Sequence, residues 1–170
     1  MKPHSQILVS REAKILAERH CWICRWDFAY GLLLGNRYRV LLALPAASIK
    51  SWEEFDRKVF DTTYLVPARQ LAASLHTSVI GGYMRSDDRL DPPDSHPFNE
   101  SGLIQVYTIV CCRQCSGSCY YYDKSPVRRD CITLASGKRL IHSLNQRRII
   151  SQWNKMLRRN SYLDEPNTAD

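Results

Sequence analysis

Two Cys-x-x-Cys pairs constrain the fold of this chain more than any other feature of its sequence. One pair is Cys21/Cys24 and the other is Cys112/Cys115. Each pair can direct two thiolates at one metal ion, and two pairs supply the four ligands of a closed tetrahedral zinc site. Residues 25–111 lie between the pairs, which is far more than the spacer of a zinc ribbon or finger. A shared site would therefore have to be closed by the tertiary fold.

The chain has seven cysteines, an odd number, and their spacing leaves several interpretations open. Structural zinc is favoured by the ligand types and the spacing. The alternatives are a disulfide framework, a thioredoxin-like redox pair at Cys21/Cys24, and buried free thiols that pack as small apolar residues. Cys111 is a spare candidate ligand. The predicted zinc ligands are drawn from His20, Cys21, Cys24, Cys112, Cys115, Cys119 and Cys131.

The length of 170 residues and the apolar fraction of 44% fit one globular domain that can bury its own core. The longest apolar run, residues 40–47, is much shorter than the roughly 18–20 residues that span a bilayer. The N-terminal residues lack the apolar stretch of a signal peptide. We therefore expect a soluble intracellular protein, with no membrane partner, in a compartment where thiols stay reduced.

Local signals predict helices and strands in mixed order, which favours an α+β fold: a single compact zinc-stabilised domain with a basic C-terminal helix. The expected elements are a helix over 11–20 with Ser10 as its N-cap, a buried strand over 38–44, a helix that starts at the capping box 51–54, an extended stretch over 64–66, a helix from Pro67 that Gly81-Gly82 stops, strands over 103–110 and 120–122, and a helix over 137–159. We expect one zinc-binding adaptor domain over 1–159 and a flexible acidic tail over 160–170.

Positive charge is concentrated after the second cysteine pair. The formal net charge is +7, and residues 124–159 hold ten basic residues but only one acidic residue, Asp130. Such a segment binds nucleic acid, an acidic protein surface or an import factor, although most runs of charge only solvate a helix face. The apolar positions change face near Arg147-Arg148, which predicts a kink or two buried faces. The expected contact residues are Lys138, Arg139, Arg147, Arg148, Lys155, Arg158 and Arg159.

Signals for catalysis are poor. The sequence has no glycine-rich phosphate loop, no Gly-x-Ser-x-Gly motif and no His-Glu-x-x-His motif. The histidines other than His20 are isolated along the chain. We therefore expect a protein that is not an enzyme.

A further pattern is the order of the motifs along residues 8–150. The motifs are Ser10-Arg11-Glu12, His20-Cys21-x-x-Cys24, Tyr64-x-x-Pro67, Gly102-Leu103-Ile104, Ile109-Val110-Cys111-Cys112-x-x-Cys115, Val127-Arg128 with Cys131, Arg139-Leu140 and Arg148-Ile149-Ile150. In this order they resemble the adenovirus early-region-4 34-kilodalton protein family. The chain is shorter than the better-known members and lacks their N-terminal extension and one middle cysteine/histidine cluster.

The resemblance implies a zinc-binding adaptor of the host nucleus, with the host cytoplasm as a second location. Members of that family link a viral early-region-1 large protein to host Elongin B/C and a cullin–RING ubiquitin ligase. The assembly leads to the degradation of host antiviral and DNA-damage proteins. Carried over by motif, the zinc ligands are His20 or Cys21 together with Cys24, Cys112 and Cys115, and the arginine-rich helix holds Arg139, Arg147 and Arg148.

One feature departs from that family. An Elongin-binding box needs a small residue, then Leu, then Cys at the fourth position after the Leu. The chain has no clear box of this kind, since Ser74-Leu75 has Val79 where the cysteine belongs. The alternative function is a zinc-stabilised nucleic-acid-binding regulator that uses residues 124–159, with nucleic acid as the partner.

Overall fold

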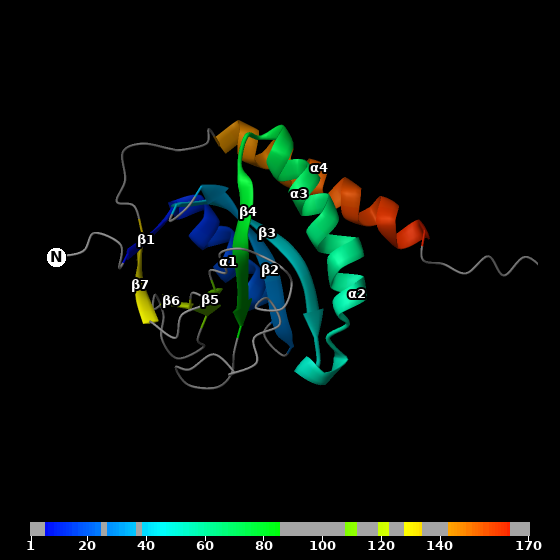
Figure 1. Ribbon diagram of the computed structural model, residues 1–170, viewed down its shortest axis with the longest axis horizontal. Coiled ribbons are helices and arrows are strands. Elements are labelled where there is room, and N and C mark those ends of the chain that lie inside the picture. Colours follow the sequence, from blue (N-terminus) through cyan, green and yellow to red (C-terminus); the bar gives the residue numbers. More distant parts are fainter. Residues whose placement is uncertain are drawn as a thin grey trace, which may run out of the picture.

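The computed structural model describes residues 6–24, 27–36, 39–85, 108–111, 119–122, 128–133 and 143–163. In these residues the fold is α+β, as expected, with strands closed into a barrel and helices packed beside them (Figure 1). The strands are β1 (Gln6–Val9), β2 (Phe28–Asn36), β3 (Arg39–Ile49), β4 (Ser78–Arg85), β5 (Thr108–Cys111), β6 (Cys119–Tyr122) and β7 (Arg128–Thr133). The helices are α1 (Arg11–Ile23), the 3₁₀ turn η1 (Trp52–Glu54), α2 (Arg57–Val59), the π-helical η2 (Phe60–Leu65), α3 (Val66–Ser74) and α4 (Ser143–Leu163).

The barrel combines antiparallel and parallel pairings. Its strand order is β1-β3-β2-β4-β5-β6-β7, and β1 pairs in parallel with β7 to close it. The long strands β2, β3 and β4 form an antiparallel centre, while β1 joins β3 and β5 joins β4 in parallel. Strand β6 pairs antiparallel with both β5 and β7. The predicted strands over 38–44 and 120–122 are confirmed as β3 and β6. The strand expected over 103–110 is seen in β5 from Thr108, and its first part lies outside the described residues.

Ser10 starts α1 as the sequence predicts and also fastens this helix to β3. Its side-chain oxygen accepts from the Ala13 amide at 3.1 Å and donates to the Leu41 carbonyl at 2.8 Å. Its own amide donates to the Val40 carbonyl at 2.9 Å. Leu41 is free for this contact because the β2–β3 register skips it at a β-bulge. One buried serine therefore caps the helix and satisfies two carbonyls of the strand.

The segment between β3 and β4 is more helical than the sequence suggests. Residues 64–66, expected to be extended, lie in η2 and α3, so that prediction is wrong. Burial of Phe60 and Leu65 holds the chain helical there. The capping box at 51–54 forms only a 3₁₀ turn, and α2 starts after it, where the Asp56 carboxylate accepts from the Val59 amide at 3.1 Å.

The prediction that Gly81-Gly82 stops the helix from Pro67 is also wrong. That helix, α3, ends at Ser74, and both glycines lie in β4. The end is set by His76, whose φ of 54° is left-handed, and by Thr77, whose amide donates to the Ala72 carbonyl at 2.9 Å. A left-handed residue at this position directs the chain out of the helix and into the strand.

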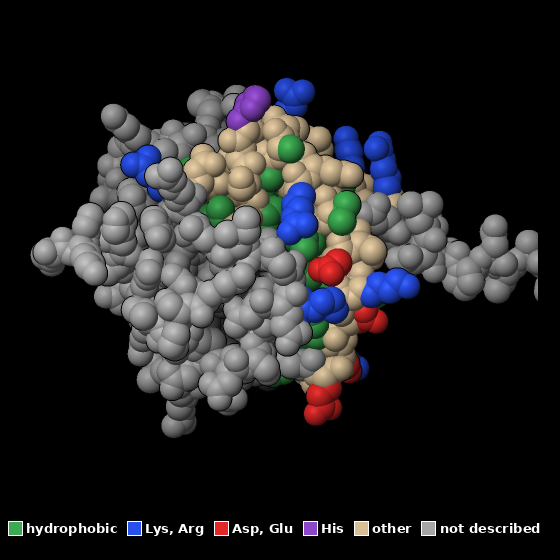
Figure 2. Space-filling view, in the orientation of Figure 1, with side chains coloured by type: hydrophobic (Ala, Val, Ile, Leu, Met, Phe, Trp, Pro, Cys, Tyr) green, Lys and Arg blue, Asp and Glu red, His purple; other side chains and the backbone are tan. Residues whose placement is uncertain are grey.

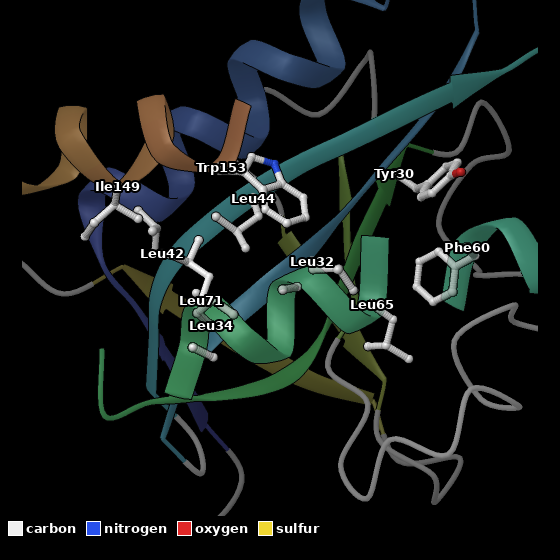
Figure 3. Close-up of a cluster of buried hydrophobic side chains, with 12 residues drawn as sticks. Tyr30, Leu32, Leu34, Leu42, Leu44, Phe60, Leu65, Leu71, Ile149 and Trp153 are labelled. Atoms are coloured by element: carbon white, nitrogen blue, oxygen red, sulfur yellow. The ribbon is translucent and has the colours of Figure 1, made fainter. Parts of the chain in front are cut away.

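The two faces of β2 and β3 pack into two separate hydrophobic clusters. Figure 3 shows Leu32, Leu34, Leu42 and Leu44 on the face that meets the helices η2, α3 and α4. The opposite face contributes Leu33 and other buried residues, which pack against small residues of α1. Because both faces are covered, β2 is apolar almost without interruption rather than alternating.

Helix α4 packs on the first of these clusters through one side. Trp153 and Ile149 are buried, and the Trp153 indole Nε1 donates to the Pro45 carbonyl at 2.7 Å. The helix continues without interruption through Arg147-Arg148, and Ile149, Trp153, Met156 and Leu157 pack on the core as one predicted face. The other predicted face, Leu140, Ile141 and Leu144, lies outside the residues whose side chains are described, so it stays a prediction. It also extends past the expected boundary at residue 160, to Leu163. Residues 137–142 of the predicted helix lie outside the described residues.

Among the helices that the structure describes, none has the length and apolar character needed to cross a membrane.

Candidate functional site

The C-terminal end of α1 carries three of the predicted metal ligands. Buried Ala13, Ala17 and Cys21 follow one another at single-turn spacing and face the sheet, so the helix backbone approaches it closely. His20 is partly buried beside them. Cys24 caps the helix end, where its amide donates to the His20 carbonyl at 3.0 Å.

His20 is held by Tyr83, a residue of β4 that sequence reasoning did not single out. A hydrogen bond of 2.7 Å joins the imidazole Nδ1 and the phenol oxygen, and the two rings meet edge to face at 5.8 Å. Tyr83 has no exposed surface. Desolvation by burial lowers the pKa of His20 from 6.5 to about 4. The imidazole is therefore neutral at neutral pH and is fixed in orientation by the phenol.

Gly31 of β2 makes room for this contact. A Cβ at that position would collide with the Tyr83 ring and with the Leu44 carbonyl oxygen. The ring of Tyr83 therefore lies directly over the Gly31 backbone, which only glycine allows at this distance. The sequence signal that could have revealed Tyr83 is weak, because it depends on the register that sets Gly31 opposite Tyr83.

The predicted zinc ligands are only partly brought together. Among residues whose side chains the structure describes, no three His, Cys, Asp or Glu side chains form a group that could hold a metal ion, so His20, Cys21 and Cys24 do not form a zinc site by themselves. Cys119 lies in β6 and Cys131 in β7, while Cys112 and Cys115 lie outside the described residues. Zinc binding stays a prediction.

A second candidate group is a cluster of aromatic rings around Tyr30. The Tyr30 ring meets the rings of Phe55, Phe60 and Tyr64 at centroid distances of 5.7, 6.0 and 5.9 Å. Desolvation, with the neighbouring Tyr64 phenol, raises the pKa of Tyr30 above its usual range. Both phenols therefore stay protonated, and the aromatic contacts indicate a structural role for this group.

The basic residues predicted on the C-terminal helix form one exposed face of α4. Arg147, Arg148, Lys155, Arg158 and Arg159 are all exposed, and α4 contains no Asp or Glu. At about 100° per residue, the five fall within about 60° of the direction opposite Trp153. In Figure 2, Lys and Arg side chains project from the upper edge, where Figure 1 places α4, while the surface below it, over α2 and α3, carries both basic and acidic side chains. Lys138 and Arg139 lie outside the described residues.

Comparison with known proteins identifies a solved structure that shares the fold but does not identify a family. No family model matches the sequence, and no curated protein matches it. Among solved structures, the chain is similar to protein DSY2949 from Desulfitobacterium hafniense, with a TM-score of 0.59 and 14% identity over 80% of this chain and 98% of that chain. The two chains therefore share a fold.

A weaker similarity links the chain to AF2198, a JAB1/MPN domain protein from Archaeoglobus fulgidus. The TM-score is 0.46 and the identity is 14%, over 76% of this chain and 99% of that chain. Neither of the two similar proteins comes from an adenovirus. Membership of the adenovirus family stays a prediction from the motif order.

Proposed function

We propose that this protein is a binding module that holds nucleic acid on the basic face of α4. The observation that carries the proposal is the one-sided charge of that helix: five exposed basic side chains on one face and no acidic residue along its length. A solvated helix face normally mixes both signs of charge. A face with one sign attracts a polyanion from solution.

The size of the face suits a phosphate backbone. The stretch from Arg147 to Arg159 rises about 18 Å along the helix axis, at about 1.5 Å per residue. Phosphates of one nucleic-acid strand follow one another at about 3.4 Å along the duplex axis, so several of them lie within that length. Each neutralised phosphate releases condensed counterions, which makes the affinity fall with added salt.

The packing of α4 presents these cations in a fixed arrangement. Trp153 and Ile149 anchor the opposite side of the helix in the core, and Ile150, Met156 and Leu157 pack against the same cluster. A ligand therefore does not have to order the helix when it binds, and the entropic cost of binding is lower than for a flexible basic tail.

Reversing two charges on this face is expected to weaken binding selectively. The variant Arg148→Glu/Arg159→Glu should bind a DNA or RNA duplex at least about tenfold more weakly than the wild type at about 50 mM salt, with a salt slope lower by about 2. Fluorescence anisotropy across a salt series measures both quantities.

The matched control makes the same charge change on α1, where Arg11 and Arg19 are exposed. Arg11→Glu/Arg19→Glu should keep affinity within about threefold of the wild type, because only long-range charge is altered. Equal losses in both double variants, or no binding by the wild type at low salt, would disprove a specific role for α4.

A protein adaptor, as the adenovirus resemblance implies, is the second candidate. The observation that favours it is an exposed apolar end of α1, where Trp22 is 71% and Ile23 72% exposed, with Ile15, 49% exposed, about two turns earlier on the same side of the helix as Trp22. Exposed apolar groups of this kind are typical of protein contacts. Pull-down from cells should then recover Elongin, a cullin or the viral early-region-1 protein with the wild type and lose it with Trp22→Ala. Recovery of none of them by the wild type removes this candidate.

A further inference from the structure

Cysteines that are far apart in the sequence occupy one row across the strands β5, β6 and β7. The register of β5 with β6 places Cys111 directly opposite Cys119. The register of β6 with β7 places Tyr120 opposite Asp130, and one further step along both strands places Cys119 level with Cys131. None of these positions follows from the spacing of the Cys-x-x-Cys pairs.

The same row continues into both neighbouring strands. The parallel pairing of β4 and β5 places Arg85 level with Cys111, and the pairing of β1 with β7 places Ile7 level with Cys131. The two ends of the row therefore differ in chemistry.

We propose that Cys111 and Cys119 form a reversible redox pair. Directly opposed residues of an antiparallel pair have Cβ atoms about 4.5–5.5 Å apart, and a disulfide needs about 3.5–4.5 Å, so a small adjustment closes the bond. Only the residues 112–118 separate the two cysteines in the sequence, so the entropic cost of closing this loop with a disulfide is low.

The reaction is an exchange with a low-molecular-weight disulfide such as oxidised glutathione. The Cys111 thiolate attacks one sulfur of that disulfide, forms a mixed disulfide and releases one glutathione thiolate. The Cys119 thiolate then attacks the Cys111 sulfur, forms the Cys111–Cys119 disulfide and releases the second glutathione. Two protein thiols are oxidised, one small disulfide is reduced to two thiols, and the protons from the protein thiols go to the released thiolates.

Peptide mapping can isolate this bond because trypsin cuts after Arg113, between the two cysteines. The full-length variant Cys112→Ser/Cys115→Ser leaves one cysteine in each flanking tryptic peptide, residues 90–113 and 114–124. After equilibration with oxidised and reduced glutathione and alkylation of free thiols, mass spectrometry should find these two peptides linked, and dithiothreitol should separate them. Adding Cys119→Ser to the variant should abolish the link.

The link should also depend on the native register. In denaturant, the equilibrium constant against glutathione should fall by about tenfold or more, because the strands no longer hold the thiols opposite each other. A circular dichroism spectrum like that of the wild type confirms that the variant is folded. The proposal is overturned if the folded variant gives no link, if Cys119 links mainly to the peptide of residues 130–138 that holds Cys131, or if denaturation leaves the equilibrium constant unchanged.

Discussion

Replacing Trp153 with alanine is expected to lower the free energy of unfolding by about 3–5 kcal/mol. The side chain has no exposed surface and lies in the cluster of Figure 3 among Leu42, Leu44 and Ile149. Alanine leaves a cavity there and removes the indole that donates to the Pro45 carbonyl at 2.7 Å. Urea unfolding followed by circular dichroism measures the loss, since that signal does not depend on tryptophan fluorescence.

Two further variants separate the contribution of the indole hydrogen bond from that of the buried ring, and compare a buried tryptophan with an exposed one. Trp153→Phe keeps an aromatic ring but leaves the Pro45 carbonyl without its donor, and is expected to cost about 1–3 kcal/mol. Trp22→Ala makes the same substitution at a side chain that is 71% exposed and should change stability by less than about 0.5 kcal/mol. If Trp153→Ala and Trp22→Ala prove equally mild, α4 does not depend on this anchor.

Acid is expected to destabilise the protein through His20. Burial holds the pKa of His20 at about 4 in the folded chain, against 6.5 for a solvated histidine of the unfolded chain. Between these two values the unfolded state binds a proton that the folded state does not, so stability falls as the pH falls from 6.5 to 4. The contribution from His20, reduced for its partial exposure, is about 2–3 kcal/mol over that range.

The variant His20→Gln isolates this effect, because glutamine does not titrate and can still reach Tyr83. Its stability, measured by urea unfolding at several pH values, should lack the part of the acid slope that His20 adds. His76→Asn removes an exposed histidine and should keep the slope of the wild type. A slope that is unchanged in His20→Gln would show that His20 is not protonated on unfolding.

Sequence reasoning recovered the elements whose signals are local. Ser10 caps α1 because its hydroxyl and the following helix-forming residues act within one turn, and Pro67 lies in the first turn of α3 for a similar local reason. The apolar residues from Val40 to Leu44 identify β3 since a buried strand needs them wherever it pairs. The α+β class followed from the mixture of these elements.

Non-local contacts account for what was missed. Gly81-Gly82 suggests the end of a helix, yet Gly81 pairs with Leu33 inside the sheet. Gly31 of β2 is required by the Tyr83 ring above it. The barrel is closed by parallel pairing between β1 and β7, the first and last described strands. Local sequence patterns do not predict which distant strands pair. The contact between His20 of α1 and Tyr83 of β4 joins residues that are far apart in the sequence, so it could not be predicted from the local pattern around either residue.

Two carbonyls of β3 accept hydrogen bonds from the side chains of Ser10 and Trp153, and these contacts affect the tendency of the protein to aggregate. Strand β3 pairs with β1 only at Arg39 and Val40, and beyond them a serine hydroxyl and an indole take up carbonyls at Leu41 and Pro45. An uncovered strand edge recruits strands from other molecules. The two side chains thus act as blocking groups against aggregation, and a molecule in which α4 has come away would be the one most prone to self-association.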